Sequence, residues 1–248
     1  VCSSDLGPTG SGKSTTLYAT LGDVAKPEIN IITVEDPVEF RMRGINQVQV
    51  NNKAGMTFAA ALRSILRADP DVVLIGEIRD QETANIAIEA SLTGHLVLST
   101  LHTNDAPSAV TRLTEMGVEP FLLSSSLAAV MAQRLARRLC KKCKRQDTAT
   151  EAELRTLGVP HMPDTPLPTI WRPVGCRECA NTGYSGRVAI QQVMGVDSTM
   201  EDLIARGATS IDIDKAAKEQ GMTTLRKDGW QKALQGITSV EEVLRVTV

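Results

Sequence analysis

The hydrophobic positions along the chain form short apolar runs that alternate with segments of helical spacing. Runs of strand length, rich in branched side chains, occupy residues 28–34, 71–77 and 95–101, and residues 44–50 alternate apolar and polar positions as a half-buried strand does. Helical spacing recurs in residues 57–68 and 81–92. Strands that alternate with helices in this way predict an α/β fold with a parallel sheet.

The remainder of the chain is predicted to be mainly helical. Residues 121–139 carry leucine, valine and methionine at a spacing that predicts one long helix. In three places a Ser or Thr precedes a Glu by three residues, which predicts helix starts at Thr148, Ser198 and Thr238. Two glycines, Gly221 and Gly236, are expected to end helices in the last third of the chain.

A glycine-rich stretch near the start carries the clearest chemical signal. The sequence from Gly7 to Thr15 fits G-x-x-x-x-G-K-[ST], a loop whose backbone N–H groups wrap nucleotide phosphates ahead of a helix. Lys13 would place its charge on the β- and γ-phosphates, and the Ser14 hydroxyl would bind Mg²⁺. The alternative is a helix-entry turn without a ligand. The predicted nucleotide-binding residues are Gly7, Thr9, Gly10, Ser11, Gly12, Lys13, Ser14 and Thr15.

The residues before this loop fit the expected context poorly. A phosphate loop normally follows a buried β-strand, whereas residues 1–6 are few and polar, with two serines and an aspartate. We therefore predict that these residues do not form that strand. We also expect the chain to begin within a larger protein, with a foreign or misread N-terminus and any preceding domain absent.

Acidic residues and a histidine follow three of the predicted strands. They are Glu35 and Asp36 after residues 28–34, Glu77 at the end of the run 71–77, and His102 after residues 95–101. Ligands of open α/β sheets bind at the carboxyl ends of the strands, so these side chains are expected beside the phosphate loop. Glu77 could polarise an attacking water or hold Mg²⁺ through one. The alternatives are a solvated acidic turn and a structural histidine.

Three further polar residues leave their roles open. Arg63 and Arg67 are one turn apart in the predicted helix of residues 57–68, where they form either a solvated face or a contact with a neighbouring subunit's phosphate. His95 begins the strand that ends before His102, roughly 20 Å away at the usual rise per residue. Spacing alone therefore does not place His95 in the site.

Composition sets the outer limits of the interpretation. With 248 residues and 42% hydrophobic content, the chain can bury a core and is expected to hold one main domain and a smaller one. The net charge of −2 provides no global attraction to nucleic acid or acidic lipid. No apolar run of about 18 residues exists, and no signal peptide is visible. We expect a soluble cytoplasmic protein.

Four of the five cysteines form two C-x-x-C pairs, Cys140 with Cys143 and Cys176 with Cys179. Two such pairs predict a closed tetrahedral Zn²⁺ site of structural type, because four thiolates leave no open position for catalysis. The alternative is four free thiols. Cys2 is outside both pairs.

The segment from Arg134 to Arg145 is the one strongly basic part of the chain, and it contains the first cysteine pair. Its charge helps to hold the thiolates ionised and could also bind nucleic acid. Two rival functions therefore stay open: a RecA-like nucleic-acid translocating ATPase that uses this segment as its track, and a non-enzymatic zinc adaptor with a relic phosphate loop.

Taken together, these motifs resemble the secretion ATPase superfamily, which drives bacterial type II secretion and type IV pilus assembly. The similarity runs from Gly7 to the last residues. It is carried by an aspartate box, a Walker B region, a histidine box and the paired cysteines, in residues 33–39, 62–71, 76–80, 93–103 and 140–179. Assembly ATPases of this superfamily carry the tetracysteine insertion, whereas its retraction ATPases lack it.

The resemblance implies a RecA-like P-loop ATPase core, a zinc-bound insertion and a helical C-terminal part. The expected boundaries are residues 1–135, 136–190 and 191–248. Glu77 would be the catalytic acid, Glu35 and His102 would act around the γ-phosphate and its Mg²⁺, and His95 would belong to the histidine box.

The resemblance further implies an assembly and a location. The family forms a homohexamer that binds ATP between two domains of a subunit, and the first of these domains is missing here. The expected partner is a platform protein of the inner membrane, with the ATPase in the cytoplasm at that membrane and no nucleic acid bound.

Overall fold

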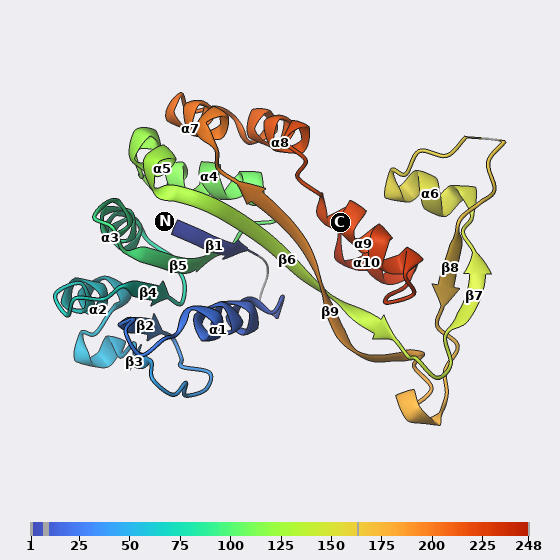
Figure 1. Ribbon diagram of the computed structural model, residues 1–248, viewed down its shortest axis with the longest axis horizontal. Helices are drawn as coiled ribbons and strands as arrows, with labels where there is room; N and C mark the ends of the chain where they lie inside the picture. Colours follow the sequence, from blue (N-terminus) through green and yellow to red (C-terminus); the bar gives the residue numbers. More distant parts are fainter. Residues whose placement is uncertain (1, 7–9, 163, 248) are drawn as a thin grey trace. The chain divides into compact units, whose positions relative to one another are not determined.

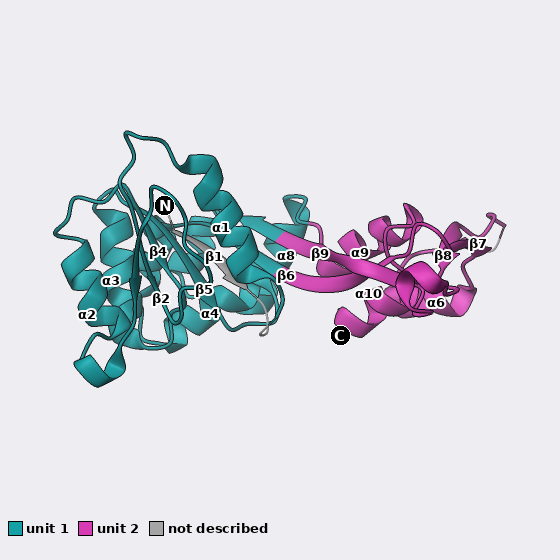
Figure 2. Cartoon of the chain, turned by 90° about the horizontal axis from the view of Figure 1, so that it is seen from below, with its two compact units in different colours: residues 1–132, 193–222 teal, residues 133–192, 223–248 magenta. Residues whose placement is uncertain are grey.

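The computed structural model describes residues 2–6, 10–162 and 164–247, and the chain divides into two compact units (Figure 2). Unit 1 comprises Val1–Ala132 and Val193–Met222, and unit 2 comprises Gln133–Gln192 and Thr223–Val248. The division into three domains at residues 135 and 190 is a different one and stays a prediction.

A seven-stranded sheet with the order β3-β2-β4-β5-β1-β6-β9 runs through unit 1 (Figure 1). Five neighbouring pairs, from β3/β2 to β1/β6, are parallel, which confirms the predicted α/β class. The strands are β1 Cys2–Leu6, β2 Ile31–Glu35, β3 Asn46–Gln49, β4 Val72–Ile75, β5 Leu96–Leu101, β6 Leu127–Leu139 and β9 Tyr184–Gly195.

Helices flank this sheet and bury their apolar stripes. Leu21, Leu62 and Leu74 are 0–1% exposed, so the helices and the central strands share a closed core. Thr57, Asp80 and Asp105 cap their helices by accepting a backbone N–H three residues ahead. The helices are α1 Lys13–Val24, η1 Asn52–Ala54, α2 Phe58–Ile65, α3 Gln81–Leu92, α4 Ala106–Glu115, α5 Pro120–Ser126, α7 Ser198–Ala205 and α8 Ser210–Glu219.

The prediction that residues 1–6 form no strand is wrong. Cys2–Leu6 forms β1, which lies between β5 and β6 and pairs with both in parallel. A strand between two others has backbone partners on both sides, and these hydrogen bonds outweigh the weak strand propensity of serine and aspartate.

The long helix predicted for residues 121–139 is also wrong. Helix α5 ends at Ser126, Leu127 takes an extended conformation, and the chain continues as β6 to Leu139. Leucine, alanine, methionine and arginine are good helix formers, but intrinsic propensity is a weak guide. Here the ladder between β1 and β6, with Ser3–Leu6 opposite Ala129–Ala132, decides the conformation.

Three predicted helix starts miss the true cap by one or two residues. The caps are Thr150, Asp197 and Ser239, with Thr150 forming a capping box with Glu153. Thr148 lies in a strand, and the Thr238 hydroxyl donates to the Arg137 carbonyl instead of capping a helix. The predicted stops are confirmed, since Gly221 and Gly236 take left-handed φ values of 95° and 66° just after α8 and after helix α9 (Leu225–Leu234).

The predicted helix 57–68 is shorter than expected. Helix α2 ends at Ile65 and is capped by Leu66, so Arg67 lies beyond it and does not share a helical face with Arg63. Both arginines are exposed, and Arg63 pairs with Glu82 of α3.

Unit 2 combines a two-stranded antiparallel sheet with short helices around its own core. The core includes Leu154, Ile170, Ile190, Trp230 and Val243. The elements are β7 Arg145–Thr148, α6 Glu151–Leu157, β8 Thr169–Arg172, η2 Arg177–Cys179, α9 Leu225–Leu234 and α10 Val240–Val246, together with parts of β6 and β9.

A buried carboxylate fastens α10 to β6 within unit 2. Glu242 is 1% exposed and accepts hydrogen bonds from the Arg137 backbone N–H at 2.9 Å and from the Arg137 guanidinium at 2.6 Å. Arg245 donates to both carboxylate oxygens, at 2.9 and 2.7 Å. Burial alone would raise the pKa of Glu242, but the bonds from Arg245 and Arg137 outweigh it and lower the pKa to about 2.

We therefore predict a pH-dependent loss of stability in Glu242→Gln. The wild-type group has its pKa depressed from 4.5, so its contribution is complete above pH 4.5 and disappears as the pH falls toward 2. At pH 7 the variant should lose about 2–3 kcal/mol of unfolding free energy. Urea unfolding followed by tryptophan fluorescence measures the loss.

The matched control is Asp164→Asn, which alters an exposed acid of the same unit and should unfold like the wild type. The difference between wild type and Glu242→Gln should shrink below pH 4.5. A difference that is constant from pH 7 to pH 3 would contradict the assignment of a stabilising charge to Glu242.

Candidate active site and metal centre

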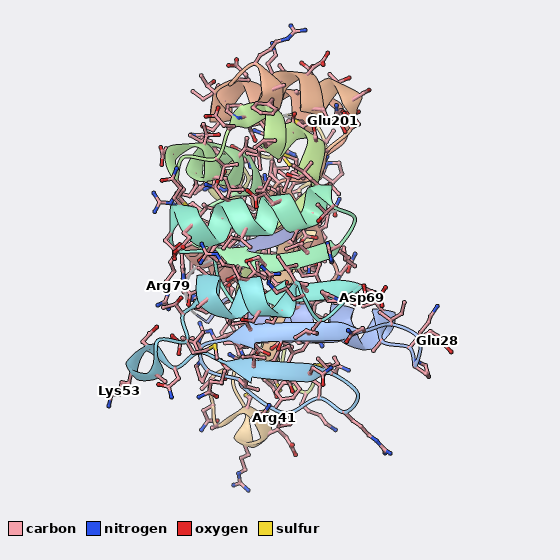
Figure 3. The ribbon with its side chains drawn as sticks, turned by 90° about the vertical axis from the view of Figure 1, so that its left-hand side faces the viewer. Glu28, Arg41, Lys53, Asp69, Arg79 and Glu201 are labelled. Carbon is pink, nitrogen blue, oxygen red and sulfur yellow. The ribbon has the colours of Figure 1, made fainter. Side chains whose placement is uncertain are left out.

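The parallel register brings the predicted site residues to one edge of the sheet. Leu6 at the end of β1 is opposite Leu101 at the end of β5, and His102 follows Leu101. Val34 of β2 is opposite Ile75 of β4. Glu35 is the last residue of β2 and Glu77 follows β4 by two residues, so both lie at neighbouring strand ends. In Figure 3, Arg79 lies at the end toward which the strand arrows point, and Asp69 lies at the opposite end.

The phosphate-loop sequence is only partly described. Gly7 and Thr9 lie outside the described residues. Gly10 and Gly12 take left-handed φ values of 83° and 91°, which a side chain would strain. Helix α1 begins at Lys13 directly after Gly12, so the positive end of its dipole lies at this point of the chain. Ser14 and Thr15 of the first turn are exposed, whereas Ser11 is buried.

Glu77 lies between two nitrogen-bearing side chains. Arg79 donates a hydrogen bond to Glu77 Oε1, and His102 Nε2 is 3.3 Å from Oε2. The bond from Arg79 lowers the pKa of Glu77 despite the opposing effect of burial. Glu77 is therefore an ionised carboxylate at neutral pH, with its side chain 16% exposed. Arg79 was not among the predicted site residues, although it is only two residues after Glu77.

A glycine lets the two acidic strand ends approach each other. A Cβ at Gly76 would lie 3.2 Å from the Glu35 Cα and 3.3 Å from the Val34 carbonyl oxygen. The Gly76 N–H donates to that oxygen at 2.7 Å, and the Thr100 hydroxyl donates to the Gly76 carbonyl at 2.7 Å. These bonds fix the turn that carries Glu77.

Glu35 is more deeply buried than its place at a strand end suggests. Glu35 is 4% exposed, and its carboxylate accepts hydrogen bonds from Tyr18, Thr33 and Gln47. Thr33 shares a strand face with Glu35 at i, i+2, so strand periodicity could have found it. Tyr18 and Gln47 come from distant segments, and nothing local in the sequence pairs them with Glu35.

His95 lies away from this edge. It precedes β5, and its Nδ1 is 2.9 Å from the Ala90 carbonyl oxygen and 3.2 Å from the Thr93 hydroxyl. It therefore sits at the end of α3, while His102 follows the opposite end of β5.

The four paired cysteines come together in unit 2. The sulfur atoms of Cys140, Cys143, Cys176 and Cys179 all lie within 4.8 Å of one another. Neighbouring sulfurs are 3.7–3.9 Å apart, so no disulfide joins them. Cys140 and Cys179 are buried and the other two are half-buried.

Backbone groups support the cysteine cluster. Burial opposes ionisation of Cys179, but N–H donors from Cys176 and Gly183 outweigh it and lower the Cys179 pKa to about 6. Gly175 and Gly183 take left-handed φ values, and a Cβ on either would lie within 2.7 Å of a neighbouring atom. The four thiols were predicted from their spacing, whereas these two glycines were not.

Some residues of the basic segment 134–145 bind other parts of unit 2, whereas others are exposed. Arg137 binds Glu242, and Lys144 donates to the Gly236 carbonyl at 2.7 Å while lying 4.5 Å above the Trp171 ring. Arg138, Lys141 and Lys142 are exposed and, with Arg187, line a cavity of about 380 Å³ beside Cys140.

Comparison with known proteins decides the family. The model of the family "Type II/IV secretion system protein" matches residues 6–245. The chain belongs to this family. It is 56% identical over 241 residues to type II secretion system protein E of Pseudomonas aeruginosa, and 52% identical over 242 residues to the type IV pilus assembly ATPase PilB of Thermus thermophilus. The two alignments include 97% and 98% of this chain, but only 47% and 27% of the length of the respective relatives.

The fold has a counterpart among solved structures. The pilus retraction motor PilT with bound ADP superposes with a TM-score of 0.73 at 26% identity, covering 98% of this chain and 60% of that one. The predicted resemblance and fold class are thus confirmed. The chain spans half or less of the curated relatives it matches. Among the described residues, no helix is long and apolar enough to cross a membrane.

The cysteine geometry predicts a metal-dependent fold for unit 2. In Cys176→Ser, one of four converging sulfurs is lost, so we expect the variant to lose its bound metal and to melt earlier. Elemental analysis and thermal unfolding measure the two effects. Cys2→Ser, which alters the one cysteine outside the pairs, should keep the metal. A Cys176→Ser protein with unchanged metal content and melting would contradict the structural role.

Proposed function

We propose that the complete protein hydrolyses ATP and that the energy powers assembly of type IV pili or type II secretion pseudopili. The observation that carries this proposal is the convergence of Glu35, Glu77 and His102 at the sheet edge where β1 leads into the phosphate-loop sequence. The named relatives, a secretion protein E and a pilus assembly ATPase, support the choice of machine.

In this proposal the glycine-rich segment holds the nucleotide. Backbone N–H groups from Gly7 to Thr15 and the α1 dipole bind the phosphates, and the Lys13 charge lies on the β- and γ-phosphates. The Ser14 hydroxyl, exposed in the first turn of α1, binds Mg²⁺. The left-handed Gly10 and Gly12 support this role because they shape the loop without strain.

Glu77 is the proposed catalytic acid residue that polarises the attacking water. Its ionised state favours acceptance of a hydrogen bond from that water. His102 lies within 3.3 Å of Glu77 Oε2, a position suited to orienting the carboxylate or sensing the γ-phosphate. Glu35 acts on the Mg²⁺ side of the nucleotide.

The proposed metal of unit 2 is Zn²⁺, held by Cys140, Cys143, Cys176 and Cys179. Tetrahedral coordination at Zn–S distances near 2.3 Å requires sulfurs about 3.8 Å apart. The neighbouring sulfurs at 3.7–3.9 Å match this value. Four cysteine ligands leave no open position, so the zinc is structural.

The proposed assembly is a homohexamer in the cytoplasm, at the inner membrane, where it meets a platform protein. No nucleic acid takes part. The rival DNA motor would use the exposed cations Arg138, Lys141 and Lys142. It predicts DNA binding that weakens by decades between low and moderate salt, whereas the secretion proposal predicts none at micromolar protein.

Glu77→Gln in the complete protein tests the catalytic assignment. The amide cannot accept the proton that the carboxylate accepts, so turnover should fall by about 10²–10⁴-fold while ATP affinity stays near that of the wild type. A phosphate-release assay and a nucleotide-binding titration measure the two quantities.

The control for this variant is Glu82→Gln, which alters an exposed acid of α3 that pairs with Arg63. It should hydrolyse ATP at close to the wild-type rate. Turnover preserved in Glu77→Gln would remove Glu77 from the mechanism.

A further inference from the structure

The Glu35 carboxylate is held by donors from three separate segments. Tyr18 of α1 donates to Oε2, while Thr33 of β2 and Gln47 of β3 donate to Oε1 at 2.5 and 3.2 Å. A carboxylate has about four lone-pair positions, so three donors leave one position for a further partner. This carboxylate is buried, fixed and still able to bind one more group.

The direction of the Tyr18 hydrogen bond follows from its second partner. The Glu39 backbone N–H donates to the Tyr18 hydroxyl oxygen at 3.3 Å. A backbone N–H can only donate, so the hydroxyl hydrogen is left for Glu35. Burial, followed by the hydrogen bond to Glu35 and its charge, raises the pKa of Tyr18 to about 12, so the phenol stays protonated at neutral pH.

The other contacts make this arrangement rigid. The Gln47 amide oxygen accepts from the Met42 N–H at 2.7 Å, and its NH₂ group donates to the Phe40 carbonyl as well as to Glu35. Tyr18 is 3% exposed, and its ring meets the Phe40 ring edge-on, with centroids 4.5 Å apart. The orientation of Glu35 is thus fixed by packed neighbours.

We propose that Tyr18 is a positioning residue for Glu35 in magnesium-dependent hydrolysis. This inference rests on the proposed function and adds a residue that neither the phosphate loop nor the acidic strand ends contain. Through it, the helix that follows the phosphate loop holds the carboxylate at the end of β2.

The place of Tyr18 on α1 explains why this link is useful. Ser14, the proposed Mg²⁺ ligand, and Tyr18 are four residues apart, so they lie on the same face of the helix. The hydrogen bond from Tyr18 therefore ties the Glu35 carboxylate to the helix that carries the proposed metal ligand.

The test compares Tyr18→Phe with the wild type in the complete, zinc-loaded protein. Phenylalanine keeps the ring packing against Phe40 and removes only the hydroxyl. Loss of a group that orients a metal-site ligand typically costs 10–100-fold. We expect kcat to fall by about tenfold or more, the magnesium concentration for half-maximal rate to rise, and KM for ATP to stay within about twofold of the wild type.

Tyr184→Phe is the matched control, because the sequence holds only two tyrosines and the Tyr184 hydroxyl also makes one side-chain hydrogen bond, to Ser239 at 2.8 Å. Tyr184→Phe loses this one neutral bond, worth about 1 kcal/mol. Tyr18→Phe loses the bond to the Glu35 carboxylate and the bond from the Glu39 N–H. The melting temperature should therefore fall more in Tyr18→Phe than in Tyr184→Phe, and Tyr184→Phe should keep the wild-type kcat and magnesium dependence.

Each outcome separates this inference from the proposed function. A wild-type protein that does not hydrolyse ATP would overturn the proposed function, and this inference with it. An active wild type with an unaffected Tyr18→Phe variant would overturn the positioning role alone. If kcat falls in both variants in proportion to their loss of melting temperature, Tyr18 has a structural role only.

Discussion

The parallel hydrogen-bond ladder of unit 1 is the constraint on which the candidate site depends. Parallel pairing from β3 to β6 gives every strand of this set the same direction, so the loops after β1, β2, β4 and β5 emerge at one edge. Residues far apart in sequence, such as Glu35 and His102, reach that edge only because of this register. Gly76 completes the arrangement, since a side chain there would separate the two acidic strand ends.

Unit 2 depends on a different kind of constraint. Its sheet has two strands and its helices are short, so contacts between side chains hold many of its loops in place. The four sulfurs gather the loops around residues 140–143 and 176–179, and the buried Glu242 fastens α10 through Arg137. Lys144, next to Cys143, connects the cysteine cluster to Gly236 at the end of α9. A metal at the cluster would therefore stabilise elements that it does not touch.

Much of the fold could be predicted from the sequence wherever pattern and local chemistry agree. The apolar runs before Glu35, Glu77 and His102 are strands, and α3 has the predicted bounds. The failures lie where tertiary partners override local preference: β1 is polar and β6 is rich in helix formers, yet both are paired on two sides. The hydrogen bonds from Tyr18 and Gln47 to Glu35 could not be predicted from the sequence either, because α1 and β3 approach β2 only in the folded chain.

The most direct test of the proposed nucleotide site is a titration of the complete, zinc-loaded protein with a fluorescent ATP analogue in the presence of Mg²⁺. We expect saturable binding in the wild type, which Lys13→Ala should abolish without loss of zinc. Lys26→Ala, which changes an exposed lysine beyond the end of α1, should leave the Kd unchanged. Nucleotide binding of equal strength in Lys13→Ala and the wild type, or no binding by the wild type, would contradict the proposed nucleotide site.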